Sequence, residues 1–299
     1  MKKLASLLMV MVMATLFFSC EKDTLGEYKP KMKIDKIYSE TEPRYLKEQW
    51  IWNGNFLSRI DYFRRSGSVE YSQNYVYEGK RLARIEMDGQ HSEFLYDGDM
   101  LTTINTYDGD QKVESYQLSY DKKKLSHISI ENDLHAKRCA VWSPMSLFVP
   151  VNQQISTNSL PASDSKREKY DFSNAEIDFI WDGDNVKYMK MQLTRPDSIQ
   201  RLIFSYVYDQ KLNPMKGFFL MNVDHQMLND QPQYTFCSKN NILSAMVTDQ
   251  YDEVFSRTRS YTYSYDYYQN FPTKVYSTFV NIETLKEDST LIYSYQYLY

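Results

Sequence analysis

Residues 75–87 read Tyr75-Val76-Tyr77-Glu78-Gly79-Lys80-Arg81-Leu82-Ala83-Arg84-Ile85-Glu86-Met87. Side chains alternate across a β-strand, so the two tyrosines share one face and Val76 takes the other. An acidic residue followed by Gly is typical of a tight turn, and type I′ turns need positive φ at both central residues. Leu82 and Ile85 then begin a return strand. The stretch therefore predicts a β-hairpin.

The same pattern recurs along the chain. The second aromatic of each unit is Trp52, Tyr77, Tyr96, Tyr120, Trp181, Tyr208, Phe236 or Tyr265. Regularly spaced hairpins are typical of a meander, a barrel or a repeat sheet. A leading strand at 33–38, eight hairpins and a closing strand at 291–299 predict about 18 strands. An open sheet would leave two unprotected edges. We therefore predict an all-β, antiparallel up-and-down meander, closed or nearly closed into a large barrel.

One irregular insertion, at about 132–168, interrupts the repeat. It contains Pro144, Pro150 and Pro161, a hydrophobic piece at 140–151 and a polar tract after it. Loops of this length are usually functional or disordered. We interpret 140–151 as a plug or lid packed on or inside the sheet. The alternative is a degenerate strand pair with a mobile tip.

The N-terminus has the features of a lipoprotein signal peptide over 1–19. Lys2 and Lys3 precede a short apolar run, and Ser19 precedes Cys20. These are the expected parts of an export signal, and the run is shorter than the roughly 20 residues that a spanning helix needs. We predict lipidation of Cys20, a polar tether over 20–31, and a single β-domain over 32–299.

Charge and cysteine content limit the partners. The chain has 35 basic and 39 acidic residues. Removal of Lys2 and Lys3 leaves 33 − 39 = −6, which disfavours nucleic acid and supplies no polybasic membrane patch. After Cys20, only Cys139 and Cys237 follow in the sequence. They form either a disulfide or two separate thiols, and the sequence leaves this open.

The two faces of the predicted sheet differ in polarity. Tyr261, Tyr263 and Tyr265 share one face, whereas Thr262 and Ser264 take the other. A lipid-facing band would instead be aliphatic, with Tyr only at its two borders, and a charge at mid-depth would cost a few kcal/mol. The return strands carry charges near their centres, such as Arg59 and Arg84. A water-soluble sheet with its aromatic face inward is favoured over a membrane pore.

Catalytic and metal motifs are not recognisable. The Asp-Gly-Asp sequences at 97–99, 108–110 and 182–184 do not continue as a calcium loop and are interpreted as turns. His91, His127, His135 and His225 lie far apart. No nucleophile motif or phosphate-binding Gly loop is present. We predict a non-enzyme without cofactor or metal.

The candidate ligand contacts are aromatic. They are the residues that end the incoming strands, with an apolar body and a hydrogen-bonding tip suited to amphiphiles: Trp52, Tyr77, Tyr96, Tyr120, Trp181, Tyr208 and Tyr265. Arg257 and Arg259 share the face of Tyr261 and are candidate contacts for an anionic head group.

The repeated aromatic-x-Tyr-Asp-Gly-x-x-Leu-x-x-Ile unit resembles the YD repeats of bacterial shell and toxin-delivery proteins. Together with the lipobox Leu16-Phe17-Phe18-Ser19-Cys20, it resembles a Bacteroidetes lipoprotein family of unknown function with a porin-like fold. The resemblance covers about 32–299 and implies a many-stranded antiparallel barrel, with no catalytic residues to transfer. Residues 21–23, Glu-Lys-Asp, resemble the export signal of surface lipoproteins in the same phylum.

Three functions fit these observations. The first is a non-enzymatic lipoprotein, anchored to the outer membrane on either its periplasmic or its surface side, that binds a lipid, glycan or other amphiphile on an aromatic concave face. The second is a structural or assembly protein that presents a β surface to a partner protein. The third, least favoured, is a hydrolase with its site in the 132–168 insertion.

Overall fold

The computed structural model describes residues 28–40, 43–132, 174–194, 198–217, 237–251, 255–280 and 287–298. These residues form sixteen β-strands: β1 (Ile34–Ser39), β2 (Tyr45–Asn53), β3 (Phe56–Phe63), β4 (Val69–Glu78), β5 (Arg81–Met87), β6 (Gln90–Asp97), β7 (Met100–Asp108), β8 (Gln111–Asp121), β9 (Lys124–Asn132), β10 (Asn174–Asp182), β11 (Asn185–Thr194), β12 (Ile199–Leu212), β13 (Asn240–Tyr251), β14 (Phe255–Tyr268), β15 (Phe271–Val280) and β16 (Glu287–Tyr297).

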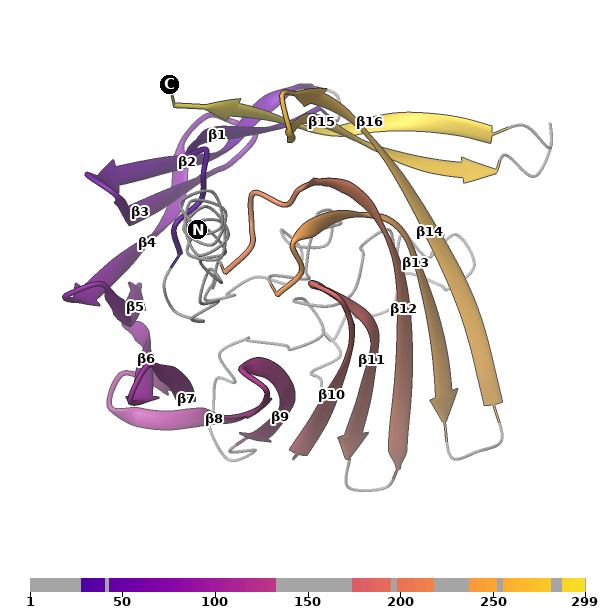
Figure 1. The fold of residues 1–299 in the computed structure, drawn as a ribbon. Helices are drawn as coiled ribbons and strands as arrows, with labels where there is room; N and C mark the ends of the chain where they lie inside the picture. The colour runs from indigo at the N-terminus through magenta and orange to yellow at the C-terminus, as the bar shows by residue number, and fades with distance from the viewer. Residues whose placement is uncertain are drawn as a thin grey trace, which may run out of the picture.

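The strands form one closed, antiparallel, up-and-down barrel. Each strand pairs with the next in sequence, and β1 pairs with β16 to close the wall. In the closing pair Ile34 lies opposite Tyr297 and Ser39 opposite Tyr293. Figure 1 shows the two terminal strands side by side. The predicted fold class and the predicted pairing of first and last strands are confirmed.

The wall contains sixteen strands rather than about eighteen. The difference lies between Tyr208 and Phe236, where two strands were predicted. Instead β12 continues to Leu212 and pairs directly with β13, with Leu212 opposite Asn240. The physical cause is the Asp209 carboxylate: it accepts hydrogen bonds from the backbone N–H of Lys211 (2.9 Å) and of Asn241 (3.1 Å). Asp209 therefore fastens β12 to β13 instead of beginning a tight turn.

The tight turns also differ in type from the prediction. In four units Gly is the first of the two central residues, and φ is 55–65° at Gly54, Gly79, Gly98 and Gly183. The residue that follows has no positive φ, and Gly at the first central position is the arrangement of type II′ turns. Two positive φ values, as in type I′, occur at Lys122-Lys123 (49° and 68°).

Six units contain a β-bulge opposite the step into their second aromatic, and in the Tyr265 unit the bulge lies further along the strand, between Asp266 and Tyr267. Ile51 lies opposite Arg59 but Trp52 lies opposite Leu57, so Ser58 is an extra residue on the return strand. The Ser58 hydroxyl donates to the carbonyl oxygen of Ile51 (2.8 Å). Thr102, Ser126 and Thr273 make equivalent bonds. The bulge increases local twist, and its polar side chain satisfies a carbonyl group beside it.

The inward face of the wall carries the hydrophobic core. Side chains that alternate along the strands are almost fully buried, among them Trp50, Ile60, Ile85, Ile104 and Phe204. The residues between them are more exposed and largely polar. The predicted inward orientation of the aromatic face is therefore confirmed for the described strands.

Several predicted features fall outside the described residues. They are the signal peptide, Cys20, Cys139, and all but the first residue of the 132–168 insertion, including the plug interpretation of 140–151. Cys237 is a buried thiol. In the part of the chain that is described, no helix is long and apolar enough to cross a membrane.

The turn geometry predicts two stability changes of opposite sign. A Cβ at Gly98 would meet no atom within 4 Å, so Gly98→Ala costs only the left-handed backbone conformation, about 1 kcal/mol. Lys123→Gly relieves the same strain at φ 68°. Because Gly also raises the entropy of the unfolded chain, the net increase in unfolding free energy should be about 0.5 kcal/mol. Urea unfolding of both variants measures the changes. Equal or reversed shifts would contradict the turn assignment.

Candidate functional site

The predicted ligand-facing aromatics gather at one end of the barrel, which we call the hairpin rim. This rim carries the turns at 54–55, 79–80, 98–99, 122–123, 183–184 and 269–270. All seven predicted aromatics come from even-numbered strands and are partly buried against the core. We call them the rim aromatics: Trp52, Tyr77, Tyr96, Tyr120, Trp181, Tyr208 and Tyr265. The sequence repeat therefore brings them together as one ring.

The polar atoms of six rim aromatics donate hydrogen bonds to backbone carbonyl oxygens, at 2.6–2.8 Å. The pairs are Trp52 with Ile34, Tyr96 with Leu82, Tyr120 with Leu101, Trp181 with Leu125, Tyr208 with Val186 and Tyr265 with Ile242. Tyr297 on β16 makes the same bond to Pro272 on β15. For the seventh rim aromatic, burial raises the pKa of Tyr77 to about 12.

These rim hydrogen bonds connect neighbouring hairpins. In every case the donor is on an even strand and the acceptor on the preceding odd strand. At the hairpin rim these two strands are not joined by a tight turn, because their connection lies at the opposite end. The aromatic side chains therefore hold adjacent hairpins together where the chain does not. The polar atoms of these side chains are already hydrogen-bonded to backbone carbonyls. A ligand could therefore contact only the faces and edges of the rings.

Basic side chains lie over three of the rings. Lys33, Arg81 and Lys124 are 5.6, 5.4 and 5.2 Å from the ring centroids of Trp52, Tyr96 and Trp181. Each also reaches the next hairpin tip: Lys33 Nζ donates to Gly54 O (2.7 Å), Arg81 pairs with Asp99, and Lys124 donates to Gly183 O. Cation–π pairs of this kind contribute about 0.5–1 kcal/mol at exposed sites. The rim thus combines aromatic surface with fixed positive charge.

Tyr28 enters this ring from the predicted tether. Its side chain is 5% exposed, its hydroxyl donates to Pro214 O (2.7 Å), and its ring lies 5.9 Å from that of Trp52 and 6.1 Å from that of Trp50. Burial, followed by the nearby Tyr77, raises the pKa of the Tyr28 hydroxyl. Tyr28, which lies within the stretch predicted as a tether over 20–31, is therefore part of the buried core cluster.

A polar network at the same rim links β12, β13 and the neighbouring hairpin tips. Asp209 accepts from the Asn241 side chain (3.2 Å) and from the Tyr267 hydroxyl, in addition to its two backbone donors. The Ser238 hydroxyl donates to the Tyr208 oxygen (3.0 Å), and the Lys239 ammonium lowers the pKa of Asp184. The segment that leads from residue 237 into β13 is therefore linked to the hairpin tip at 183–184 directly, and to β14 through Asp209.

Further from the rim, the inner face carries polar residues that sequence reasoning missed. In three incoming strands an inward aromatic donates to the acidic or amide side chain two residues earlier: Trp50 to Glu48 (2.9 Å), Tyr75 to Gln73 (3.2 Å) and Tyr116 to Glu114. Ser92 and Thr106 also bond to each other there (2.9 Å). The sequence signal was available as Glu/Gln-x-Trp/Tyr in three incoming strands. Its aromatic lies two residues before the second aromatic of the unit for Trp50 and Tyr75, and four residues before it for Tyr116.

Glu114 has the clearest electrostatic consequence. Burial raises the pKa of its carboxyl, and the hydrogen bond from Tyr116 opposes this only in part. The folded barrel therefore favours protonated Glu114. Its contribution to stability is complete below the ordinary pKa of the carboxyl and is lost as the pH rises through the folded-state pKa.

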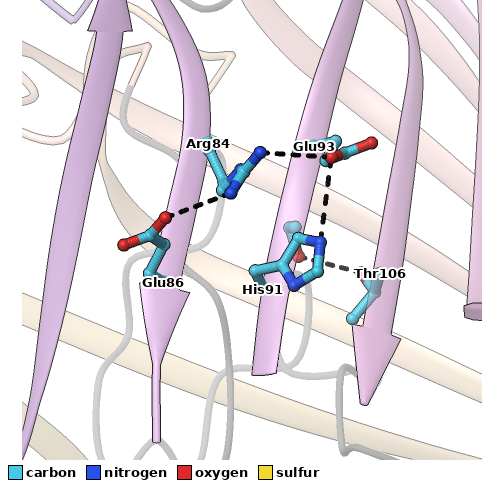
Figure 2. A network of polar contacts seen from close by, with 6 residues as sticks. Arg84, Glu86, His91, Glu93 and Thr106 are labelled. Atoms are coloured by element: carbon cyan, nitrogen blue, oxygen red, sulfur yellow. Dashed lines mark hydrogen bonds and ion pairs between the residues drawn. The ribbon is translucent and has the colours of Figure 1, made fainter. Parts of the chain in front are cut away.

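The outer face of the wall is largely polar and carries ion pairs within strands and between neighbouring strands. Figure 2 shows Arg84 between Glu86 on its own strand (3.3 Å) and Glu93 on β6 (3.5 Å). His91 lies 3.8 Å from Glu93, and its ring stacks on that of Tyr107 with 4.7 Å between centroids. On β9 and β10, His127 lies 2.8 Å from both Glu176 and Asp178. Such exposed pairs each add little stability in water.

The remaining predicted sites receive less support. Arg257 and Arg259 lie on β14, opposite Asp249 and Val247, but their side chains are outside the described residues. His135 and His225 are also outside them. No group of three or more His, Cys, Asp or Glu side chains within the described ranges could hold a metal ion.

The fold defines a closed antiparallel barrel with an aromatic rim, a largely apolar interior and a polar outer wall. No family model and no curated protein matches the chain. Solved structures with a similar fold include a porin-like protein from Bacteroides vulgatus (TM-score 0.48, 10% identity, covering 90% of this chain and 99% of that one). Another is a porin-like protein from Bacteroides uniformis (TM-score 0.46, 12% identity, covering 89% and 98%). Neither similarity bears on function.

The rim hydrogen bonds predict a measurable loss of stability when one hydroxyl group is removed. Tyr120→Phe removes the donor to Leu101 O and leaves the ring in place, so unfolding should become easier by about 1 kcal/mol. Tyr188→Phe is the matched control, because Tyr188 is 38% exposed on the outer wall. Urea unfolding compares the two. Equal effects would show that the rim bond contributes nothing.

The buried carboxyl predicts a pH-dependent difference. Glu114→Gln keeps an acceptor for Tyr116 but cannot ionise. Its melting temperature should therefore exceed that of the wild type at pH 8, and the two should converge at acidic pH. Glu93→Gln on the outer wall serves as control and should not reproduce this trend. A Glu114→Gln difference that is constant with pH would contradict the assignment.

Proposed function

We propose that the protein is a non-enzymatic lipoprotein of the cell envelope, anchored to the outer membrane through acylated Cys20, that binds an amphiphile at the hairpin rim. The observation that carries this proposal is the ring of seven rim aromatics. Because the tips of six are occupied by backbone carbonyls, their ring surfaces remain for stacking on a sugar or packing against an acyl chain. Lys33, Arg81 and Lys124 add positive charge beside those surfaces for an anionic head group.

The charges on the outer wall support the proposal that the barrel is anchored to the membrane by a lipid and is not inserted in the bilayer. Arg59 and Arg84 are about half exposed on the wall, and their partners Asp61, Glu86 and Glu93 lie on the same face. Removing such charges from water into lipid would cost a few kcal/mol each. A barrel of this surface is compatible with water on its outside and a lipid chain at its N-terminus.

A second candidate function is docking of a partner protein. It is favoured by exposed apolar residues on neighbouring strands, Tyr188 on β11, Ile203 on β12 and Met246 on β13. In the register Tyr188 lies opposite Ser205, which lies opposite Met246. These residues lie on a wall that is largely polar and would suit a β surface that a partner covers.

Native mass spectrometry of protein purified from its own host tests the first function. We expect a co-purifying small amphiphile, lost in Trp181→Ala, which removes a rim aromatic. Tyr188→Ala, an aromatic truncation on the outer wall, should retain it. A clean apo mass for the wild type would contradict ligand binding. Loss of a bound protein from Ile203→Ser or Met246→Ser, with the small ligand retained, would favour the second function.

A further inference from the structure

The hairpin rim carries an exposed apolar belt on its outer side. We define the belt as Val76, Leu95, Ile180 and Val207, which are 41–57% exposed. Each directly precedes a rim aromatic in sequence. Side chains alternate along a strand, so these residues point outward at one common height while the aromatics point inward. At the opposite rim, Val69 at the start of β4 is 51% exposed.

The composition of this rim is that of a surface at a lipid–water boundary. Aromatic side chains and Lys or Arg are enriched where proteins meet lipid head groups, with aliphatic residues on the lipid side. Three acidic residues at the tips form ion pairs: Asp99 with Arg81, Asp184 with Lys239, and Asp182 with Lys187. These pairs neutralise part of the rim charge, so apolar burial would contribute to its attraction to a membrane beside lipid charge.

The position of Tyr28 limits where a lipid anchor can reach. Tyr28 is packed inside the hairpin rim against Trp52. Seven residues lie between it and Cys20, which makes eight Cα–Cα steps. Such a chain spans about 28 Å when fully extended and about 16 Å as a flexible coil. Val69 and Val76 lie at opposite ends of β4, roughly 24 Å apart along the strand. As a flexible coil, this segment would keep an acylated Cys20 closer to the hairpin rim than to the opposite rim.

From these three observations, we infer that the hairpin rim faces the lipid bilayer and that the apolar belt rests in its head-group region. The inference depends on the proposed acylation of Cys20, but not on the proposed ligand. The occupant of the belt is a lipid surface. Tyr28 acts as the positioning residue, because it joins the anchor segment to the barrel mouth and sets which end approaches the membrane. The opposite rim, with the β9–β10 connection, is directed away from the bilayer.

The experiment uses full-length acylated protein in phosphatidylcholine vesicles. Azidophenylalanine at Val76 or at Val69 is coupled to an NBD fluorophore, and the vesicles contain a lipid with a spin label near its head group. Both positions are valines on β4, so they form a matched pair. We expect the fluorophore at Val76 to be quenched severalfold more strongly than that at Val69, with little effect of salt. Tyr28→Ala should reduce this difference, whereas Tyr28→Phe, which keeps the ring, should preserve it.

The outcomes separate this inference from the proposed function. An intact mass without acyl chains overturns both the anchor and the orientation. Acylated, vesicle-bound protein with equal quenching at the two positions, or more at Val69, overturns the orientation alone. A blue shift at Val76 that depends on protein concentration in the absence of lipid assigns the belt to a second copy of the chain, and also overturns it. Loss of the ligand in Trp181→Ala leaves the expected quenching unchanged.

Discussion

The architecture depends on hydrogen bonds from aromatic side chains to backbone carbonyls at one end of the barrel. Tight turns join strands in pairs, but each pair must also be held to the next. Trp52, Tyr96, Tyr120 and their equivalents supply this connection from the same repeat position. A buried donor without a partner costs about 1–3 kcal/mol, so each indole or phenol is favoured only when the neighbouring hairpin is in register. The repeat thereby specifies the closed wall as well as the individual hairpin.

The division between the two faces follows from the same repeat. Along each strand, residues on the same face as Trp50 or Ile85 are largely buried, whereas those on the face of Arg84 are largely exposed to water. Polar residues on the inner face are tolerated because aromatic donors two positions later satisfy them, as with Tyr116 and Glu114. The wall thus keeps a dry interior with a few bonded polar groups, and an exterior of weak, exchangeable ion pairs. A ligand at the rim would meet ring faces rather than free hydroxyl groups.

Much of this fold was predictable from the sequence, because alternation and turn chemistry are local. The rim aromatics, the first strand and the closing strand were identified from spacing alone. A separate return strand after Tyr208 was predicted wrongly, because the direct pairing of β12 with β13 depends on contacts that are distant in sequence, such as that of Asp209 with Asn241. Tyr28 was assigned to a tether because its partner Pro214 is far away in sequence. The acceptors of the rim aromatics are backbone carbonyls, which no residue pattern identifies.

The pairing of Ile34 with Tyr297 has a consequence for how the molecule forms. These residues are about 260 positions apart, and contacts of high sequence separation slow folding. Until the last strand arrives, the first strand presents unsatisfied amide and carbonyl groups along its length, a template for intermolecular association. Premature truncation would therefore be more harmful than loss of an internal hairpin of similar size. The rate of folding should therefore be limited by the pairing of the first strand with the last, and aggregation should depend on how well these two strands are protected before they pair.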